Sequence, residues 1–344
     1  MRKKAPVSLR NPFAVTHVPG LAKLYVWAHN AEGLSFSSRL RRFFGQKLYR
    51  ILRKTPAVPR WGTFRYGDAG RGFLINFDAR NTQFLSLYDR SYRYGYEIET
   101  SLALDSLADK DGVFYDVGSN WGHFSLFLSS RPGYNGKIFA FEPFPSSFSD
   151  LRSTIEQAGL SGRITAYAFA LSDFDGESSM EVPDGIRSGL AALSSSGSPG
   201  GTTTKVAKLD SLDLPPPSLM KIDVEGNEAR LIIGGRKTIA KNTPYIVFEH
   251  HRESLEPSFT VFSELEKLGY LFYLPSLQFA TATNVFRVTY GEDYAGLIDR
   301  YGKCSFCLVP MRVEERSLFP PQLNILAVHK RKAKNVKHLV VRRD

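Results

Sequence analysis

Short apolar runs alternate with segments of helical spacing through the middle of the chain. Five of these runs end at a polar or glycine-bearing turn: VFYDVG, KIFAFEP, RITAYAFAL, SLMKIDVEG and TPYIVFEHH. Apolar residues at helical spacing lie between several of them, as over residues 145–158 and 226–240. Runs that are apolar on both faces and separated by helices are typical of parallel strands covered on both sides. The pattern predicts a doubly wound, mostly parallel α/β sheet, which we expect to be seven-stranded.

The flanking segments predict additions to this sheet. Residues 1–60 combine basic runs with apolar residues at roughly helical spacing, and residues 61–110 indicate short strands followed by a helix. We therefore divide the chain into a basic, helical N-terminal extension (1–60), a small strand and helix subdomain (61–110), a ligand-binding main domain (111–330) and a basic tail (331–344). Residues 184–204 are rich in Gly, Ser and Thr, which predicts a long mobile loop near the carboxyl ends of the strands.

The net charge of +11 is concentrated at the two ends of the chain. Residues 1–60 contain 13 Lys and Arg residues against one acid, and residues 330–344 contain seven against one, whereas the remainder is acidic. An enzyme acting on nucleic acid would carry positive charge around its cleft, so nucleic acid is not the expected partner. The basic ends are interpreted as solvated tails or as contacts to anionic lipid headgroups or to a partner.

The composition is that of a globular protein from a reducing compartment. No apolar run reaches the length of a membrane-spanning helix, and no apolar segment follows the basic N-terminus as in a secretory signal. There are two cysteines, Cys304 and Cys307, and a single CxxC pair cannot complete a zinc site. We interpret them as half-buried thiols on a strand. We expect a cytoplasmic protein, membrane-associated if its basic ends bind lipid.

A glycine-bearing turn follows the first apolar run, at the place where ligands bind in open α/β sheets. Gly118 and Gly122 allow a tight turn and let a ligand approach the backbone without meeting a Cβ atom. Asp116 places a carboxylate beside the turn, which suits an ammonium group better than a diphosphate. A plain strand-to-helix turn is the alternative interpretation.

Glu142 ends the second run and adds a second acid. A carboxylate at a strand tip can accept hydrogen bonds from both hydroxyls of a ribose; the alternative is a helix N-cap, because Pro143 follows. Asp116 and Glu142 at successive strand ends indicate an adenosyl ligand with a zwitterionic tail. A nicotinamide dinucleotide is disfavoured, because its fingerprint requires glycine where this chain has Asn120.

Polar residues after the fourth and fifth runs form the candidate acceptor site. Asp223 and Glu225 follow the fourth run, and Glu249 and His250 end the fifth. For transfer to a hydroxyl, we nominate His250 or Asp223 as the general base, with Glu225 orienting the acceptor. These four side chains could also bind a divalent ion, but their spacing does not require one, and we expect no metal.

Several linked motifs resemble those of the FkbM-family methyltransferases: FYDVGSNWGHFS, IFAFEPFPSSFSDL, ALSDFDGESS, LMKIDVEGNEARLIIGG and TPYIVFEHH. The resemblance spans roughly residues 64–329 and leaves out residues 1–60 and the basic tail. It implies a class I, Rossmann-like methyltransferase fold, S-adenosyl-L-methionine as the methyl donor, and an oxygen acceptor on a sugar or natural product.

The resemblance also implies roles for individual residues. The methionine part of the donor would be held by four positions in the first turn: Asp116, Gly118, Asn120 and Gly122. Glu142 would hold the ribose, and Ser172 and Asp173 would lie beside the adenine. Glu97, in YGYE, would reach the cofactor from the helix before the sheet. Trp121 departs from the small or aliphatic residue of many members, which would narrow the pocket.

We therefore expect an enzyme that methylates a hydroxyl of a glycan or natural product. The basic ends favour a lipid-linked acceptor, with peripheral contact to an anionic membrane. The alternatives are an RNA or other nucleic-acid methyltransferase and a non-catalytic module that binds S-adenosylmethionine. The sequence predicts no particular oligomeric state.

Overall fold

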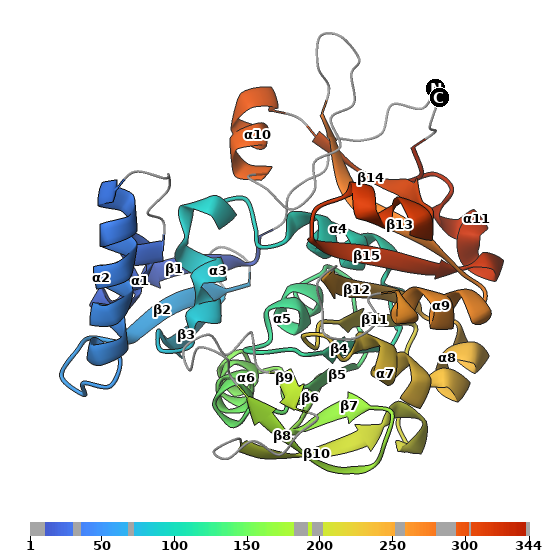
Figure 1. Cartoon of the computed structure of the whole chain (residues 1–344), viewed down its shortest axis with the longest axis horizontal. Helices are drawn as coiled ribbons and strands as arrows, with labels where there is room; N and C mark the ends of the chain where they lie inside the picture. The colour runs from blue at the N-terminus through green and yellow to red at the C-terminus, as the bar shows by residue number, and fades with distance from the viewer. Residues whose placement is uncertain are drawn as a thin grey trace.

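An eight-stranded sheet crosses the centre of the molecule in the computed structural model (Figure 1). Its strands lie side by side in the order β14 (Cys304–Met311), β13 (Tyr270–Phe279), β15 (Gln322–His329), β12 (Tyr245–His251), β11 (Leu219–Ile222), β4 (Phe114–Val117), β5 (Ile138–Phe141) and β6 (Ile164–Tyr167). The structure describes residues 11–29, 36–67, 72–181, 192–194, 202–251, 259–279, 294–302 and 304–341.

The strands from β12 to β6 are parallel, whereas β15 runs antiparallel to β12, and β13 runs antiparallel to both β15 and β14. The predicted doubly wound, mostly parallel α/β class is confirmed. The predicted count of seven strands is wrong, because β14 pairs with β13 along its whole length and adds an outer strand.

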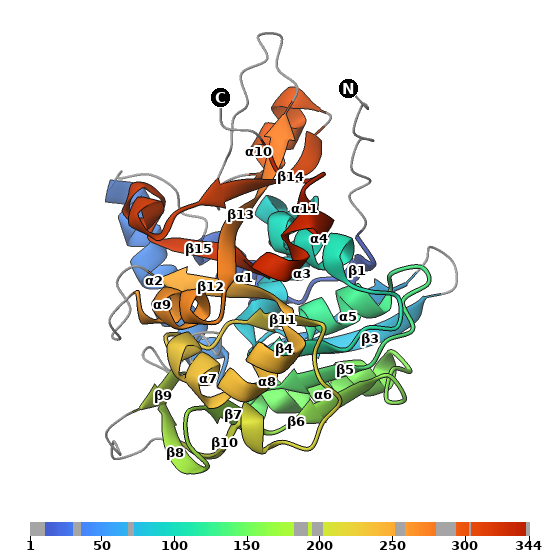
Figure 2. The same cartoon turned by 90° about the vertical axis from the view of Figure 1, so that its right-hand side faces the viewer.

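Helices cover both faces of this sheet because the strand side chains alternate between two apolar cores (Figure 2). Phe114 on β4 packs in one core with α4 (Ile98–Leu107), α5 (His123–Ser129) and α6 (Pro145–Gln157). The next residue, Tyr115, packs in the other core with α7 (Glu228–Gly234), α8 (Arg236–Asn242) and α9 (Thr260–Lys267). A strand that is buried on both faces is apolar at nearly every position, which explains the apolar runs. Asp116 on β4 and Lys221 on β11 are buried exceptions.

The third apolar run, expected as one strand, is divided between two sheets. Its first half is β6, and its second half, β7 (Phe169–Ser172), begins a four-stranded sheet in the order β7, β10 (Thr202–Lys208), β8 (Gly176–Glu181) and β9 (Ala192–Ser194). The expected loop over residues 184–204 lies outside the described residues, apart from β9 and the start of β10.

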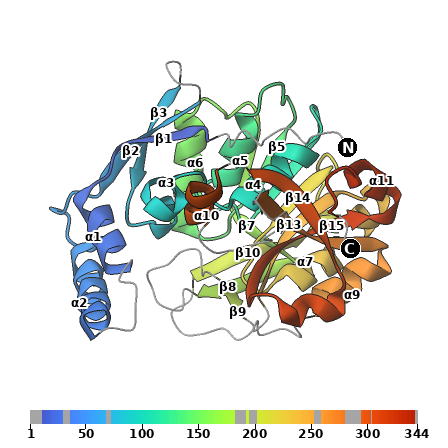
Figure 3. The ribbon, with the colours of Figure 1, turned by 90° about the horizontal axis from the view of Figure 1, so that it is seen from above.

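The N-terminal region holds a three-stranded sheet and two helices. β1 (Phe13–His17) pairs antiparallel with β2 (Trp61–Tyr66), which pairs with β3 (Phe73–Asp78). Helices α1 (Gly20–His29) and α2 (Phe36–Leu52), which we call the helix pair, lie side by side at one end of the molecule (Figure 3). The pairing of β1 with β2 therefore crosses the boundary that the sequence suggests at residue 60. The ring of Phe13 also packs across this boundary, against Phe64 and Trp121.

The basic C-terminal segment packs against the main sheet as far as residue 341. It forms η6 (Lys330–Lys332) and α11 (Ala333–Val336), the side chain of Val336 is buried, and the amide of Val341 donates to the carbonyl of Leu308. The interpretation of this segment as a solvated tail does not hold for these residues. The segment and the helix pair lie at opposite ends of the molecule (Figures 1 and 3).

The remaining elements are short. They are η1 (Thr82–Phe84), α3 (Leu85–Tyr88), η2 (Arg90–Tyr92), η4 (Leu209–Ser211), α10 (Tyr294–Tyr301) and η5 (Val313–Leu318). Cys304 and Cys307 lie on β14 without a disulfide, and both are buried rather than half-buried. Within the described ranges, no helix has the length and apolar character needed to span a bilayer.

Candidate functional site

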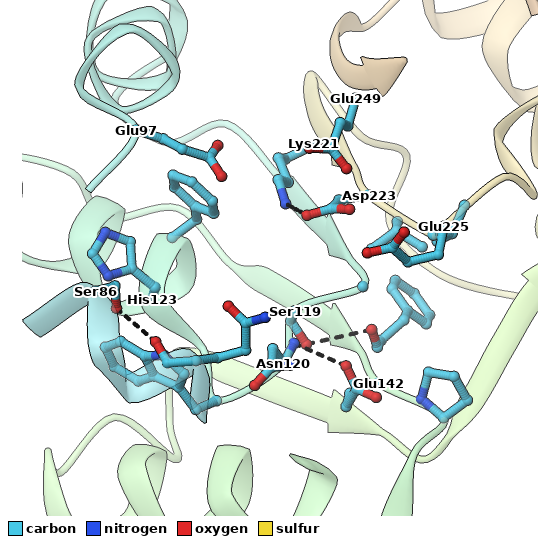
Figure 4. Close-up of a pocket in the computed structure, with 18 of the residues that line it drawn as sticks. Ser86, Glu97, Ser119, Asn120, His123, Glu142, Lys221, Asp223, Glu225 and Glu249 are labelled. Atoms are coloured by element: carbon cyan, nitrogen blue, oxygen red, sulfur yellow. Dashed lines mark hydrogen bonds and ion pairs between the residues drawn. The ribbon is translucent and has the colours of Figure 1, made fainter. Parts of the chain in front are cut away.

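A cavity of about 380 Å³ lies at the carboxyl ends of the parallel strands (Figure 4). The turn after β4 lines it together with residues at the ends of β5, β11 and β12 and with part of β7. Tyr25 of α1 and residues of η1 and α3 contribute from the N-terminal region. Because the tips of parallel strands meet at one edge of the sheet, residues far apart in the sequence come together here.

The turn after β4 approaches β11 so closely that its first glycine cannot carry a side chain. Gly118 has a φ of 77°, and a Cβ atom there would lie 1.7 Å from the carbonyl oxygen of Asp223. Gly118 lines the cavity, as the sequence analysis expects. The requirement for glycine nevertheless comes first from this backbone contact rather than from a ligand. Asn120, with a φ of 46°, continues the left-handed turn and also lines the cavity.

Among the described residues of this turn, Asp116 and Gly122 lie outside the cavity lining. Asp116 is fully buried; one carboxylate oxygen accepts a hydrogen bond from Ser125 Oγ at 2.6 Å, and the other has no partner in the described part of the chain. A Cβ atom at Gly122 would lie 2.8 Å from Leu151 Cδ1, so this glycine permits the packing of α6. Both residues support the turn from behind, and their expected contact with the donor stays a prediction.

Glu142 lines the cavity and binds the backbone on both sides. Its Oε2 accepts from the amide of Asn120 at 2.9 Å, and its Oε1 accepts from the amide of Phe144, just before α6, at 2.8 Å. Burial raises the pKa of Glu142 to about 7, although the two hydrogen bonds act in the opposite direction. Each carboxylate oxygen keeps a lone pair for a ligand hydroxyl. A ligand contact and a role at the helix start are therefore compatible.

The part of the cavity wall where Ser172 and Asp173 are expected is formed by the residues just before them in the chain. Phe169, Ala170 and Leu171 of β7 line the cavity. Ser172 is fully buried and its hydroxyl donates to Asn227 Oδ1 at 3.1 Å, while Asp173 pairs with Arg230. Ser172 and Asp173 are not among the residues that line the cavity, because β7 leaves the main sheet and presents its earlier residues. Their expected place beside the adenine stays a prediction.

Lys221 is a cationic residue at the centre of the site to which the sequence analysis assigns no role. It is 2% exposed, its Nζ lies 2.6 Å from Asp223 Oδ2, and it lies 4.8 Å from the centre of the Phe124 ring (Figure 4). Burial disfavours its charge, but the surrounding carboxylates of Asp223, Glu97 and Asp116 raise its pKa above the usual range. Conversely, Lys221 overcomes the effect of burial on Asp223 and lowers the pKa of that carboxyl group.

Glu97 reaches the same cavity from the start of α4, as the sequence analysis expects. Its φ of 39° is left-handed, and its Oε2 accepts a hydrogen bond from Asn324 Nδ2 at 3.0 Å. Burial raises the pKa of Glu97, while nearby Lys221 lowers it. The side chain points into the cavity opposite Glu225 in Figure 4.

Glu225, Glu249 and His251 form a second charged group beside Lys221. Each offers a ligand atom to a common point, and these atoms lie within 4.8 Å of one another. Glu249 Oε2 lies 3.0 Å from His251 Nε2, and this contact raises the pKa of His251 to about 9. Burial and then Asp223 raise the pKa values of both glutamates. The group could hold a cation; the expectation of no metal stays a prediction.

His250 is turned away from this group. Successive residues of a strand point to opposite faces, so Glu249 faces the cavity while His250 packs against the rings of Phe259 and Phe262. Its Nδ1 accepts a hydrogen bond from Arg316 Nε at 3.0 Å. The nomination of His250 as a general base is therefore corrected, because its ring belongs to the buried packing behind the sheet.

A second cavity of about 520 Å³ adjoins the first. The two share a wall made of Tyr92, Tyr96, Glu97, Glu249 and Gln322. Beyond this wall the second cavity is lined by residues from α4, α10 and the segment that leads into β15. The edge of the sheet thus offers two adjoining spaces with two carboxylates between them.

Sequence reasoning missed most residues of the shared wall. Tyr92 lies in a segment without a recognisable motif, and only the fold brings it and Gln322 to the strand tips. Lys221 did carry a signal, since a lysine inside an otherwise apolar strand must find buried partners. His123, at the start of α5, also lines the first cavity, and burial lowers its pKa to about 3.

Comparisons with known proteins identify a matching family. The methyltransferase FkbM domain matches residues 79–272, more than half of the chain. The hexuronic acid methyltransferase AglP of Haloferax volcanii is 30% identical over 148 residues, which are 42% of this chain and 58% of that protein. The chain therefore matches somewhat more than half the length of this curated relative.

Three solved structures are also similar. Methyltransferase FkbM from Methylobacillus flagellatus has 15% identity over 57% of this chain and 43% of its own, with a TM-score of 0.35. A precorrin-6y C5,15-methyltransferase from Geobacter metallireducens has 17% identity over 67% of this chain and 88% of its own, with a TM-score of 0.34. TYW2 of M. jannaschii, in complex with AdoMet, has 10% identity over 76% of this chain and 84% of its own, with a TM-score of 0.36.

The matched range contains the parallel strands β4, β5, β6, β11 and β12. It also contains Glu142 and Asp223, the acidic residues just after β5 and β11. S-adenosylmethionine, the donor expected from the sequence, is the cofactor that this match supports. The chain belongs to the FkbM methyltransferase family.

Proposed function

We propose that this chain transfers the methyl group of S-adenosylmethionine to a hydroxyl group of a neutral sugar. One observation carries the proposal: two adjoining cavities share a wall that contains Glu97 and Glu249, at the edge of the sheet where the family motifs end. A donor and an acceptor bound on the two sides of this wall would meet beside a carboxylate.

The first cavity fits the donor. S-adenosylmethionine supplies a methyl group already activated by its bond to a positively charged sulfur. Glu142 offers carboxylate lone pairs to the ribose hydroxyls, and the apolar residues Phe169 and Leu171 offer a surface to the adenine. Glu97 and Asp223 supply negative charge toward the sulfonium and ammonium groups, in excess of Lys221, the one lysine in the described lining of this cavity.

The second cavity suits a neutral polar acceptor. Its described lining includes three acids, Glu97, Glu99 and Glu249, together with the amides of Gln322 and Asn324, and it includes no Lys or Arg. Carboxyl and amide groups hydrogen-bond sugar hydroxyls, whereas a negatively charged acceptor would lack a cationic partner among these residues. The name of the Haloferax volcanii relative supports a sugar, but the charge of this cavity favours an uncharged one.

Glu249 is the proposed general base. It lines both cavities and belongs to the shared wall, so it can reach an acceptor hydroxyl from the donor side. Gln322 Nε2 and His251 Nε2 orient its two oxygens. Burial raises its pKa toward neutrality, where a base transfers protons most effectively. Glu249 would take the hydroxyl proton as the acceptor oxygen is methylated, while Asp223 stays paired with Lys221. Glu225, expected from the sequence to orient the acceptor, lines the donor cavity and not the second cavity.

Transfer of labelled methyl groups to sugars tests this proposal. The chain is incubated with labelled S-adenosylmethionine and, separately, with neutral hexosides and hexuronides, and donor affinity is measured by calorimetry. We expect label on the neutral hexosides and a fall in kcat of about 10²-fold or more for Glu249→Gln, with unchanged donor affinity. Glu264→Gln, in an ion pair with Arg236 outside both cavities, is the matched control.

The outcomes separate the parts of the proposal. Absence of donor binding would overturn it entirely. Donor binding with label on hexuronides alone would overturn the neutral acceptor, and wild-type turnover of Glu249→Gln would exclude this residue as the base.

A further inference from the structure

One face of α2 is apolar, exposed and bordered by basic residues. Phe43, Phe44 and Ile51 are 63%, 55% and 58% exposed, and Leu40 and Leu48 extend the same surface. Their positions, i, i+3, i+4, i+8 and i+11 counted from Leu40, form one stripe of a helix. We call this surface the apolar stripe of α2.

The opposite face of α2 is fixed to the rest of the molecule. At Gly45 a Cβ atom would lie 2.5 Å from the Cβ of Ala28, so α2 touches α1 with almost no space between the two backbones. Tyr49 is buried, packs on the Tyr25 ring and donates its hydroxyl to the carbonyl of Ala79 at 3.1 Å. The helix therefore packs through a buried face of its own, and the apolar stripe is a second, exposed face.

The charge around the apolar stripe has a single sign. Residues 36–54 contain seven Lys and Arg residues and no acid. Arg39, Lys47, Arg50 and Lys54 are exposed beside or within the stripe. A helix with aromatic and aliphatic residues on one face and basic residues at its margins is typical of segments that lie in the interface of an anionic bilayer. A protein partner would need an apolar groove rimmed entirely by acids to match it.

The helix pair also contributes to the first cavity. Tyr25 of α1 lines that cavity and packs on Tyr49 of α2. Figures 1 and 3 show α1 and α2 beside the sheet of β1, β2 and β3. Gln83 of η1 and Leu85 of α3 line the cavity together with Tyr25. A surface bound by α2 would thus lie next to the reaction site. The basic C-terminal segment lies at the far end and cannot share that surface.

We propose that the apolar stripe of α2 inserts into the headgroup region of an anionic bilayer, and that this places the site next to acceptor sugars carried on lipids. The second half rests on the proposed function. The basic residues would contact lipid phosphates, and Phe43, Phe44 and Ile51 would enter the boundary with the acyl chains.

Cosedimentation of the full chain with vesicles tests the membrane contact. We expect binding to phosphatidylcholine vesicles that contain phosphatidylglycerol, weakening as salt is raised, and little binding to phosphatidylcholine alone. Phe43→Ser with Phe44→Ser should weaken binding by about tenfold or more, because two large apolar side chains no longer leave water. The matched control is Phe73→Ser with Leu74→Ser, an exposed apolar pair on β3 that should bind as wild type.

Several results would overturn the membrane contact. They are no binding of the wild type to anionic vesicles, undiminished binding of the Phe43 and Phe44 variant, and equal loss in the control. Light scattering without lipid completes the test: a dimer that the Phe43 and Phe44 substitutions dissociate, with no vesicle binding, would assign the stripe to a second copy. Binding to an RNA homopolymer in place of vesicles would likewise refute a bilayer.

Activity measurements keep the two proposals distinct. On a water-soluble hexoside, the Phe43 and Phe44 variant should turn over as wild type, whereas on a lipid-linked hexoside in anionic vesicles its rate should fall about tenfold. Equal rates on the lipid-linked acceptor would refute the role of the stripe in presentation. Failure of the wild type on every sugar would overturn the proposed function and leave the vesicle result standing.

Discussion

Replacing Glu99 by glutamine is expected to remove a loss of folding stability that the wild type undergoes as the pH rises. Glu99 lies in the first turn of α4, is 7% exposed, and lines the second cavity. Its Oε2 has no hydrogen-bond partner among the described residues. Burial, with a smaller contribution from Glu97, raises the pKa of Glu99 from 4.5 to about 8. The folded chain therefore holds this proton more tightly than the unfolded chain does.

The direction and size of the effect follow from this pKa. A carboxyl group with a raised pKa in the folded state contributes stability that is fully present below its unfolded pKa and is lost as the pH rises through its folded pKa. The window here extends from about 4.5 to about 8. At about 1.4 kcal/mol per pH unit, Glu99 alone would remove on the order of 3 kcal/mol between about pH 5 and pH 8. Glutamine does not titrate, so the free energy of unfolding of Glu99→Gln should rise relative to that of the wild type by this amount over the same pH range.

Urea unfolding of both proteins over this pH range measures the effect. The difference between their free energies of unfolding should change by about 3 kcal/mol in favour of Glu99→Gln as the pH rises. An unpaired amide adds a constant penalty of about 1–3 kcal/mol that does not depend on pH. Ser129→Ala, at another buried oxygen without a described partner, should show a difference independent of pH. A constant difference for Glu99→Gln would refute the raised pKa.

Three further predictions concern the site. Gly118→Ala should abolish donor binding in calorimetry, because its Cβ atom meets the Asp223 carbonyl oxygen. Gly162→Ala, with open space around it, should bind the donor as wild type, and equal affinities of the two variants would contradict the turn geometry. Glu142→Gln should weaken donor binding about tenfold. The affinity of the wild type for the donor should fall as the pH drops below about 7, where Glu142 gains a proton; an affinity that does not change with pH would count against contact between Glu142 and the ribose. Dialysis against EDTA should leave turnover unchanged, because His251 already supplies positive charge beside Glu249; a loss that Mg²⁺ restores would show a metal requirement.

The sequence determined the layered fold and the first half of the site. Parallel strands covered on both faces are apolar at nearly every position, here with Asp116 and Lys221 as buried exceptions, and they end where the chain turns polar. The ends of the apolar runs at Val117, Phe141 and Ile222 therefore indicate where these strands end. Glu142 and Asp223 follow such tips, and parallel strands end at one edge. Their presence in one cavity therefore required only the order of the elements.

The tertiary structure decided which side chains face the reaction. In Glu249-His250-His251 all three residues are polar, and the sequence does not tell which alternate positions point to the cavity. The packing of His250 against Phe262 and Arg316 decides it. The second cavity depends on contacts between segments far apart in the chain, such as Glu97 with Asn324. Such contacts leave no periodicity in the sequence, because they arise only when separately formed elements pack together.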